Sequence, residues 1–432
     1  MHTEGLGKTV LDHRYKGIPL GVELPLSELG DQGWNVARGD LSLPVTTLRA
    51  EALAHNIATF AEYCRRHGAE LAPHGKTTMS PQLFQRQLEA GAWAITAATP
   101  GQVRIMREFG VPRVLVANEV VEPSALRWIG GQLEADPGFE FLCLVDAVAT
   151  VELMDTALRG VLSTRRLPVL LELGVPGGRT GVRTHEDALA VARAVHASST
   201  LELAGVETYE GLAASAATPA ELTAVDGLLG RVRAAVTDIA AAGLFAPGDV
   251  VVTAGGSIHF DRVVACLSDW ADSPVTPKLV LRSGCYVSHD AGRYHQLSPL
   301  DGRRSADEPL ELRNALESWA VVLSRPEPGL VIAGAGKRDL PYDVEPPIPL
   351  RVHRRNGDAA SEAPEVVDLA GATVTKLMDQ HAFLTVDPAV PIAAGDIIVF
   401  GLSHPCAAFD KAPLLPLIDD DYTVVDGVIT FF

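Results

Sequence analysis

The sequence has little of several features that mark large classes of protein. Its 432 residues include five cysteines, 6% aromatic residues, and 36 basic against 54 acidic side chains, for a formal net charge of -18. The cysteines are scattered with no C-x-x-C pair, which excludes a disulfide framework and a complete structural zinc site. An acidic chain repels phosphate backbones and anionic lipid heads, and no basic patch offsets this repulsion. We therefore expect no nucleic-acid partner and no membrane partner.

Long hydrophobic runs are also absent. No apolar run approaches the roughly 18 to 20 residues that a membrane-spanning helix needs, and the first residues, MHTEGLGKTVLDHRYKGIP, lack the apolar core of a signal peptide. The sequence thus predicts a cytoplasmic protein. What remains is an ordinary globular composition, 47% hydrophobic and 21% charged, in a chain long enough to bury a large core.

Short apolar runs alternate with segments of helical spacing from about residue 70 to 285, a pattern typical of repeated β/α units and a parallel sheet. Between the first two runs, Ser80 is placed to cap a helix, Pro81 to occupy its first position and Gly91 to end it. Eight runs occur, and eight is the strand number of a (β/α)8 TIM-type barrel, which is the predicted fold. The runs cover residues 71–74, 93–97, 113–117, 139–145, 168–173, 203–209, 249–254 and 278–283.

The composition and the spacing of apolar residues change beyond residue 300. A polar, acidic connector leads into proline-rich and β-branched stretches such as GATVTKL and GDIIVFG, where helical spacing mostly disappears. This pattern favours a second, mainly β domain. We therefore expect an N-terminal segment, residues 1–45, that packs on the other domains, a barrel over residues 46–300 and a mainly β domain over residues 301–432.

A lysine follows the first predicted strand. Lys76 lies in the motif PHGKTT, with His74 two residues before it, and the barrel prediction puts both at the carboxyl ends of the strands, where barrel enzymes carry out chemistry. An amine at that position can form a Schiff base with a carbonyl compound. The alternative is an ordinary surface lysine at a strand end, and spacing alone leaves that alternative open.

Glycine-rich turns follow the seventh and eighth predicted strands. TAGGSIHFD comes after strand seven and SGCY after strand eight, and the backbone amides of such turns can bind an anion. Barrel enzymes often bind a phosphate in these two loops. Either turn could instead be a structural turn only. The predicted phosphate cradle consists of Gly255, Gly256, Ser257, Ser283, Gly284 and Cys285.

Two further strand ends present side chains that could contact a cofactor ring. Arg179 lies in the glycine-rich loop after strand five, and Tyr209 ends strand six in the motif ETYEG. An arginine or tyrosine at a barrel mouth can contact an aromatic ring at its nitrogen or its face. A lysine, a phosphate cradle and ring contacts together fit pyridoxal 5'-phosphate (PLP).

The C-terminal region contains a histidine and a cysteine separated by one proline, in the motif SHPCAAFD. His404 and Cys406 form a borderline-soft donor pair that suits zinc, Zn2+, but a closed structural site would need four protein ligands. A zinc ion held by these two would keep open positions for water or substrate. The motif could equally be a turn. His381, in DQHAFL, is a possible additional ligand or a packed histidine.

These motifs together resemble a known family. PHGKTT, RTGV, ETYEG, AGGS, SGCY, DQHAFL and SHPCAAFD are similar to motifs of the fold-type III PLP enzymes related to alanine racemase, in the D-serine dehydratase and D-threonine aldolase branch, and the resemblance runs from about residue 45 to the C-terminus. It implies that Lys76 carries PLP as an internal aldimine, that the glycine loops hold its phosphate, and that His404 and Cys406 bind zinc. Members of the aldolase branch carry an aspartate at the position of Cys406.

The resemblance implies a lyase, a PLP- and zinc-dependent dehydratase or ammonia-lyase of D-serine or a related D-β-hydroxy amino acid, and suggests a homodimer. The expected products are a keto acid and ammonia. One alternative is a metal-dependent D-threonine-type aldolase, which gives glycine and an aldehyde. Another is a non-catalytic PLP carrier, which would need neither the second domain nor a metal pair. The sequence leaves open the exact substrate and whether the β domain covers its own barrel or a neighbour's.

Overall fold

The structure of the chain is a computed structural model that describes residues 1–271, 273–354 and 364–432. The described chain forms two compact units. The first, the barrel unit, comprises Phe60–Lys76 and Gln87–Gly284 together with Met1, and the second, the β unit, comprises His2–Thr59, Thr77–Arg86 and Cys285–Phe432. Over the described residues, no helix is both long and apolar enough to cross a membrane.

The barrel unit is built on eight parallel strands in the order β4-β11-β10-β9-β8-β7-β6-β5. A parallel bridge between His74 and Thr96 joins the two ends of this order, so the sheet closes into a barrel. Each of the eight apolar runs overlaps one of these strands, which confirms the predicted fold. The strands are β4 Glu70–Leu71, β5 Ile95–Ala97, β6 Arg113–Glu119, β7 Glu140–Val145, β8 Leu167–Leu173, β9 Leu201–Thr208, β10 Val251–Ala254 and β11 Lys278–Leu281.

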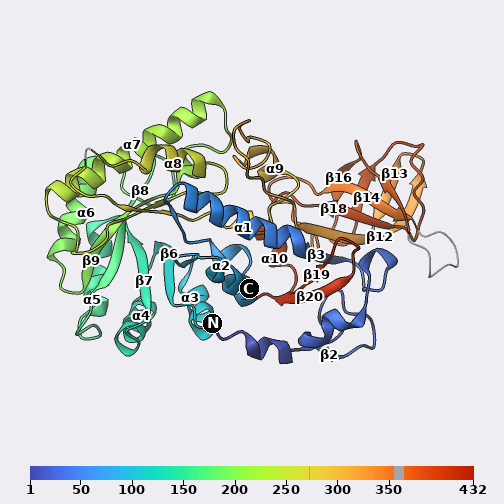
Figure 1. Ribbon diagram of the computed structural model, residues 1–432, viewed down its shortest axis with the longest axis horizontal. Helices are drawn as coiled ribbons and strands as arrows, with labels where there is room; N and C mark the ends of the chain where they lie inside the picture. The colour runs from blue at the N-terminus through green and yellow to red at the C-terminus, as the bar shows by residue number, and fades with distance from the viewer. Residues whose placement is uncertain (272, 355–363) are drawn as a thin grey trace. The chain divides into compact units, whose positions relative to one another are not determined.

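Helices follow the strands and cover the outside of the barrel (Figure 1). Several begin at a polar cap followed by proline: Thr99 accepts from the amide of Gln102 before Pro100, and Thr218 forms a capping box with Glu221. These helices are α3 Pro100–Glu108, α4 Pro123–Ala135, α5 Val148–Leu158, α6 His185–Ala197, α7 Pro219–Ala241 and α8 Phe260–Leu267.

The helix predicted after Ser80 is present as α2, Pro81–Glu89. Pro81 is its first residue, and Gly91 follows it with φ +97, a left-handed conformation that glycine adopts without strain. The prediction that Ser80 caps the helix is wrong for the side chain. Its hydroxyl is buried and has no hydrogen-bond partner in the described structure, while its backbone carbonyl accepts from Leu83 and Phe84.

The barrel interior is apolar at one level and charged at another. Ala72, Leu115, Leu142, Leu170 and Val280 belong to one buried cluster contributed by five different strands or strand ends. The charged level contains Arg282, which directly follows the last strand.

Arg282 is buried and forms an ion pair with the fully buried Glu207 of β9, and it donates to the hydroxyl of Thr253 at 2.8 Å. Burial raises the pKa of Glu207 to about 7, and the positive charge of Arg282 acts in the opposite direction. A charged residue inside a barrel needs such a partner, because burying an unpaired charge costs several kcal/mol.

The β unit is built around a ten-stranded, mainly antiparallel sheet, which confirms the predicted mainly β domain. The long strand β12 pairs with β3, β13 and β18, and Trp319 on β12 is fully buried with its indole N–H bonded to the hydroxyl of Thr47 at 2.9 Å. The strands are β3 Val45–Arg49, β12 Leu316–Glu327, β13 Leu330–Ala333, β14 Ile348–Arg354, β15 Glu365–Asp368, β16 Thr373–Leu377, β17 Ala382–Thr385, β18 Ile397–Gly401, β19 Leu414–Ile418 and β20 Val424–Ile429.

The N-terminal segment packs on the β unit. Asn35 caps the short 3-10 helix η3, Val36–Arg38, and pairs with Thr423 in an isolated bridge just before β20. The amide of Val36 donates to the carbonyl of Tyr422 at 3.0 Å. The other elements of this segment are η1 Glu4–Lys8, β1 Val10–Leu11, β2 Leu24–Pro25 and η2 Leu26–Gln32.

The two compact units do not follow the expected ranges 46–300 and 301–432. Strand β3 pairs with β12 and in parallel with β19, so the residues just after position 45 belong to the β sheet. The division falls within helix α1, Ala50–Arg66, between Lys76 and Thr77, within α2, and between Gly284 and Cys285. Composition could not locate these boundaries, because they depend on strand pairs that are distant in the sequence, such as β3 with β12.

Close contact between β9 and β10 yields a testable prediction. A β-carbon added at Gly205 of β9 would overlap the backbone carbonyl oxygen of Val251 in β10. We expect Gly205→Ala to lower the free energy of unfolding by about 1–3 kcal/mol, because backbone in a closed barrel cannot move away freely.

The control is Gly227→Ala on α7, where an added β-carbon meets nothing within 4 Å. It should raise stability by about 0.5–1 kcal/mol through helix propensity. Denaturant unfolding of both variants measures the difference, and equal stabilities would contradict the assigned strand contact.

Candidate active site

Lys76 follows the first barrel strand. It lies in the single-turn helix η4, Gly75–Thr77, five residues beyond Leu71 of β4, and its side chain is exposed. His74, two residues earlier, is bridged to Thr96 of β5. The Nδ1 atom of His74 is shielded from solvent and has no hydrogen-bond partner within the described residues. Burial, followed by the charge of Lys76, holds the pKa of His74 well below its usual value, so its imidazole is neutral.

The glycine turn after β10 is closely tied to Glu210. The amides of Gly255 and Gly256 donate to the two carboxylate oxygens of Glu210, at 3.0 Å and 2.6 Å. Gly255 has φ +95, and Glu210 is almost fully buried. The expectation that both amides are free for an anion is therefore wrong. A carboxylate on the preceding strand end already accepts from them, and sequence reasoning assigned it no role although it lies in the ETYEG motif.

The turn after β11 contacts the first glycine turn through Ser283. Its buried hydroxyl lies 2.9 Å from the carbonyl oxygen of Gly255 and 3.2 Å from that of Gly256. Ser283 therefore fastens the two turns to each other, and its hydroxyl is engaged with backbone. The structure brings the predicted turns together, as expected for neighbouring strands β10 and β11.

Arg179 and Tyr209 lie against each other at the ends of β8 and β9. The guanidinium carbon of Arg179 is 5.1 Å from the centre of the Tyr209 ring, within the range of a cation–π contact. The ring of Tyr209 also lies close to the first glycine turn, since a β-carbon added at Gly256 would be 2.8 Å from one of its ring carbons. Tyr209 thus stands between the arginine and the turn.

Two buried carboxyl groups in the barrel had no place in the sequence prediction. The carboxylate oxygens of Glu119 on β6 and Glu172 on β8 are shielded from solvent and have no donor among the described residues. Burial, followed by the neighbouring carboxyl group of Glu172, raises the pKa of Glu119 to about 9. Glu119 is therefore protonated at neutral pH. No periodicity signals this pairing, because the two strands are not neighbours in the sequence.

A pair of thiols lies in the β unit. The sulfur of Cys285 is 3.6 Å from the sulfur of Cys406, and the hydroxyl of Thr77 is 3.3 Å from the same Cys406 sulfur. Cys285 is buried, and its pKa is raised, chiefly by its hydrogen bond with Cys406 and then by burial. The pKa of Cys406 is lowered, chiefly by that same hydrogen bond. The contact between the two sulfurs therefore favours the charged form of Cys406 and the neutral form of Cys285.

His404 stands beside this pair. Hydrogen bonding with Cys406 is the main cause that raises the pKa of His404, to about 9, and Asp343 adds to it through a 2.5 Å contact with Nδ1. The predicted pair His404 and Cys406 is therefore brought together. As the side chains stand in the described structure, no group of three or more His, Cys, Asp or Glu residues is arranged to hold a metal ion. Within the described residues, His404 and Cys406 are therefore not part of a larger cluster of such side chains.

His381 and Cys285 differ from their predicted positions. His381 is exposed and lines a surface groove of about 540 Å³ at the turn between β16 and β17, with Lys337 and Lys376. None of the contacts that His404 and Cys406 make within the described chain involves His381. Cys285, expected in the phosphate cradle, directs its side chain to Cys406.

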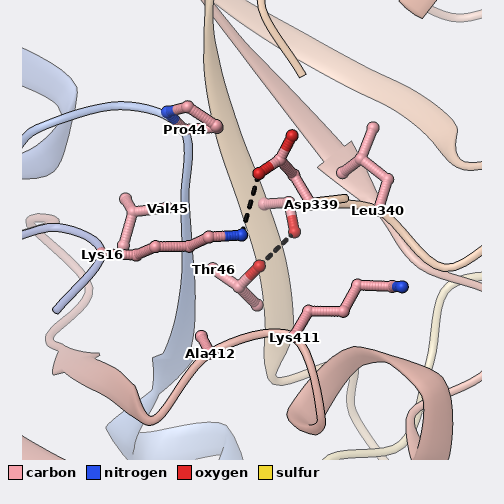
Figure 2. Close-up of a pocket in the computed structure, with 9 residues that line it drawn as sticks. Lys16, Pro44, Val45, Thr46, Asp339, Leu340, Lys411 and Ala412 are labelled. Carbon is pink, nitrogen blue, oxygen red and sulfur yellow. Dashed lines mark hydrogen bonds and ion pairs between the residues drawn. The ribbon is translucent and has the colours of Figure 1, made fainter. Parts of the chain in front are cut away.

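A small cavity in the β unit is not a substrate site. Figure 2 shows Lys16 and Lys411 on its walls, with Lys16 bonded to Asp339 at 2.9 Å. Thr46, also on its wall, is bonded to the hydroxyl of Ser318 at 2.7 Å. The cavity measures about 10 Å³, which is room for about one water molecule. Its polar groups are already paired, so it offers no place for an amino acid.

Two family models match successive parts of this chain. Residues 48–260 match the N-terminal domain of alanine racemase, and residues 315–418 match a serine dehydratase domain. The chain belongs to the alanine racemase-like, fold-type III PLP enzymes. PLP is the cofactor that this family implies, and the serine dehydratase match places the chain in the dehydratase and aldolase branch of PLP-dependent lyases.

Relatives within the branch differ in reaction. The chain is 24% identical to a D-threonine aldolase of Arthrobacter sp over 411 residues, 95% of each chain. The crystal structure of D-threonine aldolase from Filomicrobium marinum superposes with a TM-score of 0.74 at 23% identity, over 92% of this chain and 96% of that one. D-threo-3-hydroxyaspartate dehydratase from Delftia sp. HT23 gives a TM-score of 0.68 at 23% identity, over 91% and 98%.

Two solved variants of D-threo-3-hydroxyaspartate dehydratase concern a histidine and a cysteine. In one variant the histidine is replaced by alanine, and in the other the cysteine two positions further along is replaced, in a metal-free form. His404 and Cys406 of the present PLP enzyme have the same spacing.

The hydrogen bonds of Glu210 yield a second prediction. Replacing Glu210 with alanine leaves the amides of Gly255 and Gly256 without their acceptor, so the turn should lose its fixed conformation. We expect Glu210→Ala to weaken PLP affinity at least tenfold in a fluorescence titration of the apoprotein.

The matched control is Glu202→Ala on the same strand, β9, where the carboxylate is half-buried and lies near the opposite end of the strand from Glu210. Its PLP affinity should stay within about twofold of the unchanged protein. Tighter PLP binding by Glu210→Ala would show that the carboxylate competes with the phosphate rather than positioning the turn.

Proposed function

We propose that this PLP enzyme is a zinc-dependent dehydratase of D-serine or a related D-β-hydroxy amino acid, which releases a keto acid and ammonia. The observation that carries the proposal is that the imidazole of His404 and the sulfur of Cys406 lie together. A thiolate and an imidazole favour zinc, whereas a carboxylate at this position would favour a harder ion. Dehydration requires the loss of a hydroxyl group, a poor leaving group that a Lewis acid activates.

The residues of the barrel unit fit PLP. Lys76 offers an exposed amine at the carboxyl ends of the strands, and Tyr209 and Arg179 present a ring and a cation there. The neutral His74 has an unpartnered Nδ1 atom that a polar group of the cofactor could satisfy. With Gly255 and Gly256 bound to Glu210, the phosphate would depend more on Ser257 and the backbone of Gly284 than on the first two glycine amides.

The residues of the β unit fit an open zinc site. Cys406 and His404 supply two ligands, and the remaining positions would be left for substrate and water, as in catalytic rather than structural zinc sites. The same spacing of histidine and cysteine in D-threo-3-hydroxyaspartate dehydratase, whose cysteine variant is metal-free, supports this assignment.

PLP supplies, when bound, a carbonyl for the substrate amine and a ring that withdraws electrons from Cα, and zinc supplies a Lewis acid for the β-hydroxyl. The protein's own residues then have defined tasks. Lys76 would hold the cofactor through its Nζ atom, and the same amine would be the group that accepts the Cα proton of the substrate. Asp343 fixes the orientation of the His404 ring through Nδ1, which leaves Nε2 for the metal.

Aldol cleavage is the second candidate, and the similarity to D-threonine aldolases favours it. The same groups would serve, with the β-hydroxyl losing a proton and the Cα–Cβ bond breaking. The two reactions differ in products, since cleavage gives glycine and an aldehyde. A non-catalytic PLP carrier would give no turnover with any D-β-hydroxy amino acid.

The role of Lys76 can be tested chemically. Borohydride should link PLP irreversibly to the tryptic peptide that contains Lys76, because only an amine bonded to the cofactor carbonyl is trapped. Peptide mass spectrometry measures the site. Lys76→Ala should lose at least a thousandfold in turnover with little change in melting temperature, since an exposed side chain contributes little to the core.

Lys278 provides the internal comparison. It begins β11 and forms an ion pair with Asp249, at the opposite ends of the strands from Lys76. In the Lys278→Ala variant, borohydride should still link PLP to Lys76. Labelling at Lys278 in the unchanged protein would refute the assignment of Lys76.

The proposed reaction is tested by products and by metal removal. D- and L-forms of serine, threonine and 3-hydroxyaspartate are supplied to the holoenzyme, and ammonia, keto acid, glycine and aldehyde are measured. We expect ammonia and keto acid from a D-substrate, with at least a hundredfold loss after chelation and recovery on adding zinc. The cofactor absorbance should survive chelation, because the barrel residues that fit PLP include no metal ligand.

Cys406→Asp is the matched variant, because it exchanges sulfur for carboxylate oxygen. It should keep some metal and shift preference from zinc towards manganese. Full dehydratase activity in a verified metal-free sample would remove zinc from the proposal, and glycine as the main product would establish the aldolase instead.

A further inference from the structure

The thiol pair of the β unit carries an inference beyond the proposed function. All five cysteines are free, and Cys285 and Cys406 are the two whose sulfur atoms are in contact, 3.6 Å apart, within the described residues. They lie 121 positions apart in the sequence. Each is the first residue of a short helical turn, Cys285 of η6, Cys285–Val287, and Cys406 of α10, Cys406–Phe409.

The separation is small enough for a covalent bond to form by local movement. A disulfide has an S–S length of about 2.05 Å, so the two sulfurs need to approach by about 1.5 Å. Side-chain rotation with a slight shift of a short turn provides such a movement. Cys406 belongs to a helix of only four residues, which is easier to displace than a strand of the sheet.

The two cysteines differ in access. Cys285 is 5% exposed, whereas Cys406 is partly exposed. Cys406 is therefore the more accessible of the two to a small oxidant, and the sulfur of Cys285 lies close enough to react with the oxidised sulfur. A reactive, accessible cysteine next to a second cysteine that resolves it is the arrangement of redox-sensitive protein thiols.

We propose that Cys285 and Cys406 are an oxidation site at which hydrogen peroxide forms a reversible disulfide. The sulfur of Cys406 attacks one peroxide oxygen, the O–O bond breaks, and one water leaves, which gives a sulfenic acid. The sulfur of Cys285 then attacks that sulfur, the S–O bond breaks, and a second water leaves. Two thiols are oxidised, one peroxide is reduced, and two waters form.

The disulfide has a consequence that rests on the proposed function. Cys406 supplies the sulfur of the proposed zinc site, and a disulfide sulfur no longer serves as a thiolate ligand. Oxidation and metal binding therefore exclude each other. Bound zinc should protect the pair, and the disulfide should abolish zinc binding.

The test uses the full-length protein, with and without zinc, treated with hydrogen peroxide. Remaining thiols are alkylated and the peptides are analysed by mass spectrometry. We expect a peptide that joins Cys285 to Cys406, two hydrogens lighter than the sum of its parts and cleaved by dithiothreitol. Cys64, Cys143 and Cys266 should remain reduced and therefore be alkylated. Zinc should slow formation of the disulfide at least tenfold.

Two variants test whether the disulfide requires Cys285. Cys285→Ala should leave Cys406 as a sulfenic acid that proceeds to the sulfinic acid, whereas Cys266→Ala should still form the disulfide. Sulfinic acid at Cys406 in the unchanged protein, with Cys285 still free, overturns the proposal. A disulfide that forms equally fast with and without zinc supports the oxidation site and overturns the metal role of Cys406, so the two ideas fail separately.

Discussion

Closure of the barrel between β4 and β5 is the constraint on which the candidate active site depends. Strand β4 has only two residues, yet its extension donates from Ala72 to Leu281 at 2.8 Å and accepts at Leu71 from Trp93 at 2.7 Å. Lys76 lies only five residues further on. A few backbone hydrogen bonds of this short segment therefore set the position of Lys76 relative to the glycine turns.

The strands and the glycine turns could be predicted from the sequence because both have local causes. Apolar runs at regular spacing identify buried strands, and a glycine at φ +95, such as Gly255, marks a turn that other residues enter only with strain. Glu210 could not be identified in the same way. Its hydrogen bonds reach 45 and 46 residues along the chain, and they depend on the pairing of β9 with β10.

The same reasoning explains the reassignment of Cys285. From the sequence it belonged to the glycine turn SGCY and hence to an anion site, and its backbone does follow Gly284. Its side chain, however, points to a residue 121 positions away. The backbone and the side chain of one residue can contact different parts of the structure. A sequence motif predicts the local backbone conformation but not the distant contact of the side chain. The raised pKa of Glu119 beside Glu172 is a similar case, because two acidic residues on separate strands become neighbours only after the barrel has closed.

Strand β3 lies near the start of the chain, yet its partners β12 and β19 lie far towards the end. During synthesis, the residues of the barrel emerge from the ribosome before either partner does. Most of the barrel unit can therefore begin to fold while β3, although already synthesised, still lacks both of its partner strands. Contacts of such long sequence separation form slowly, so the edges of β3 stay unpaired until the C-terminal strands have been made.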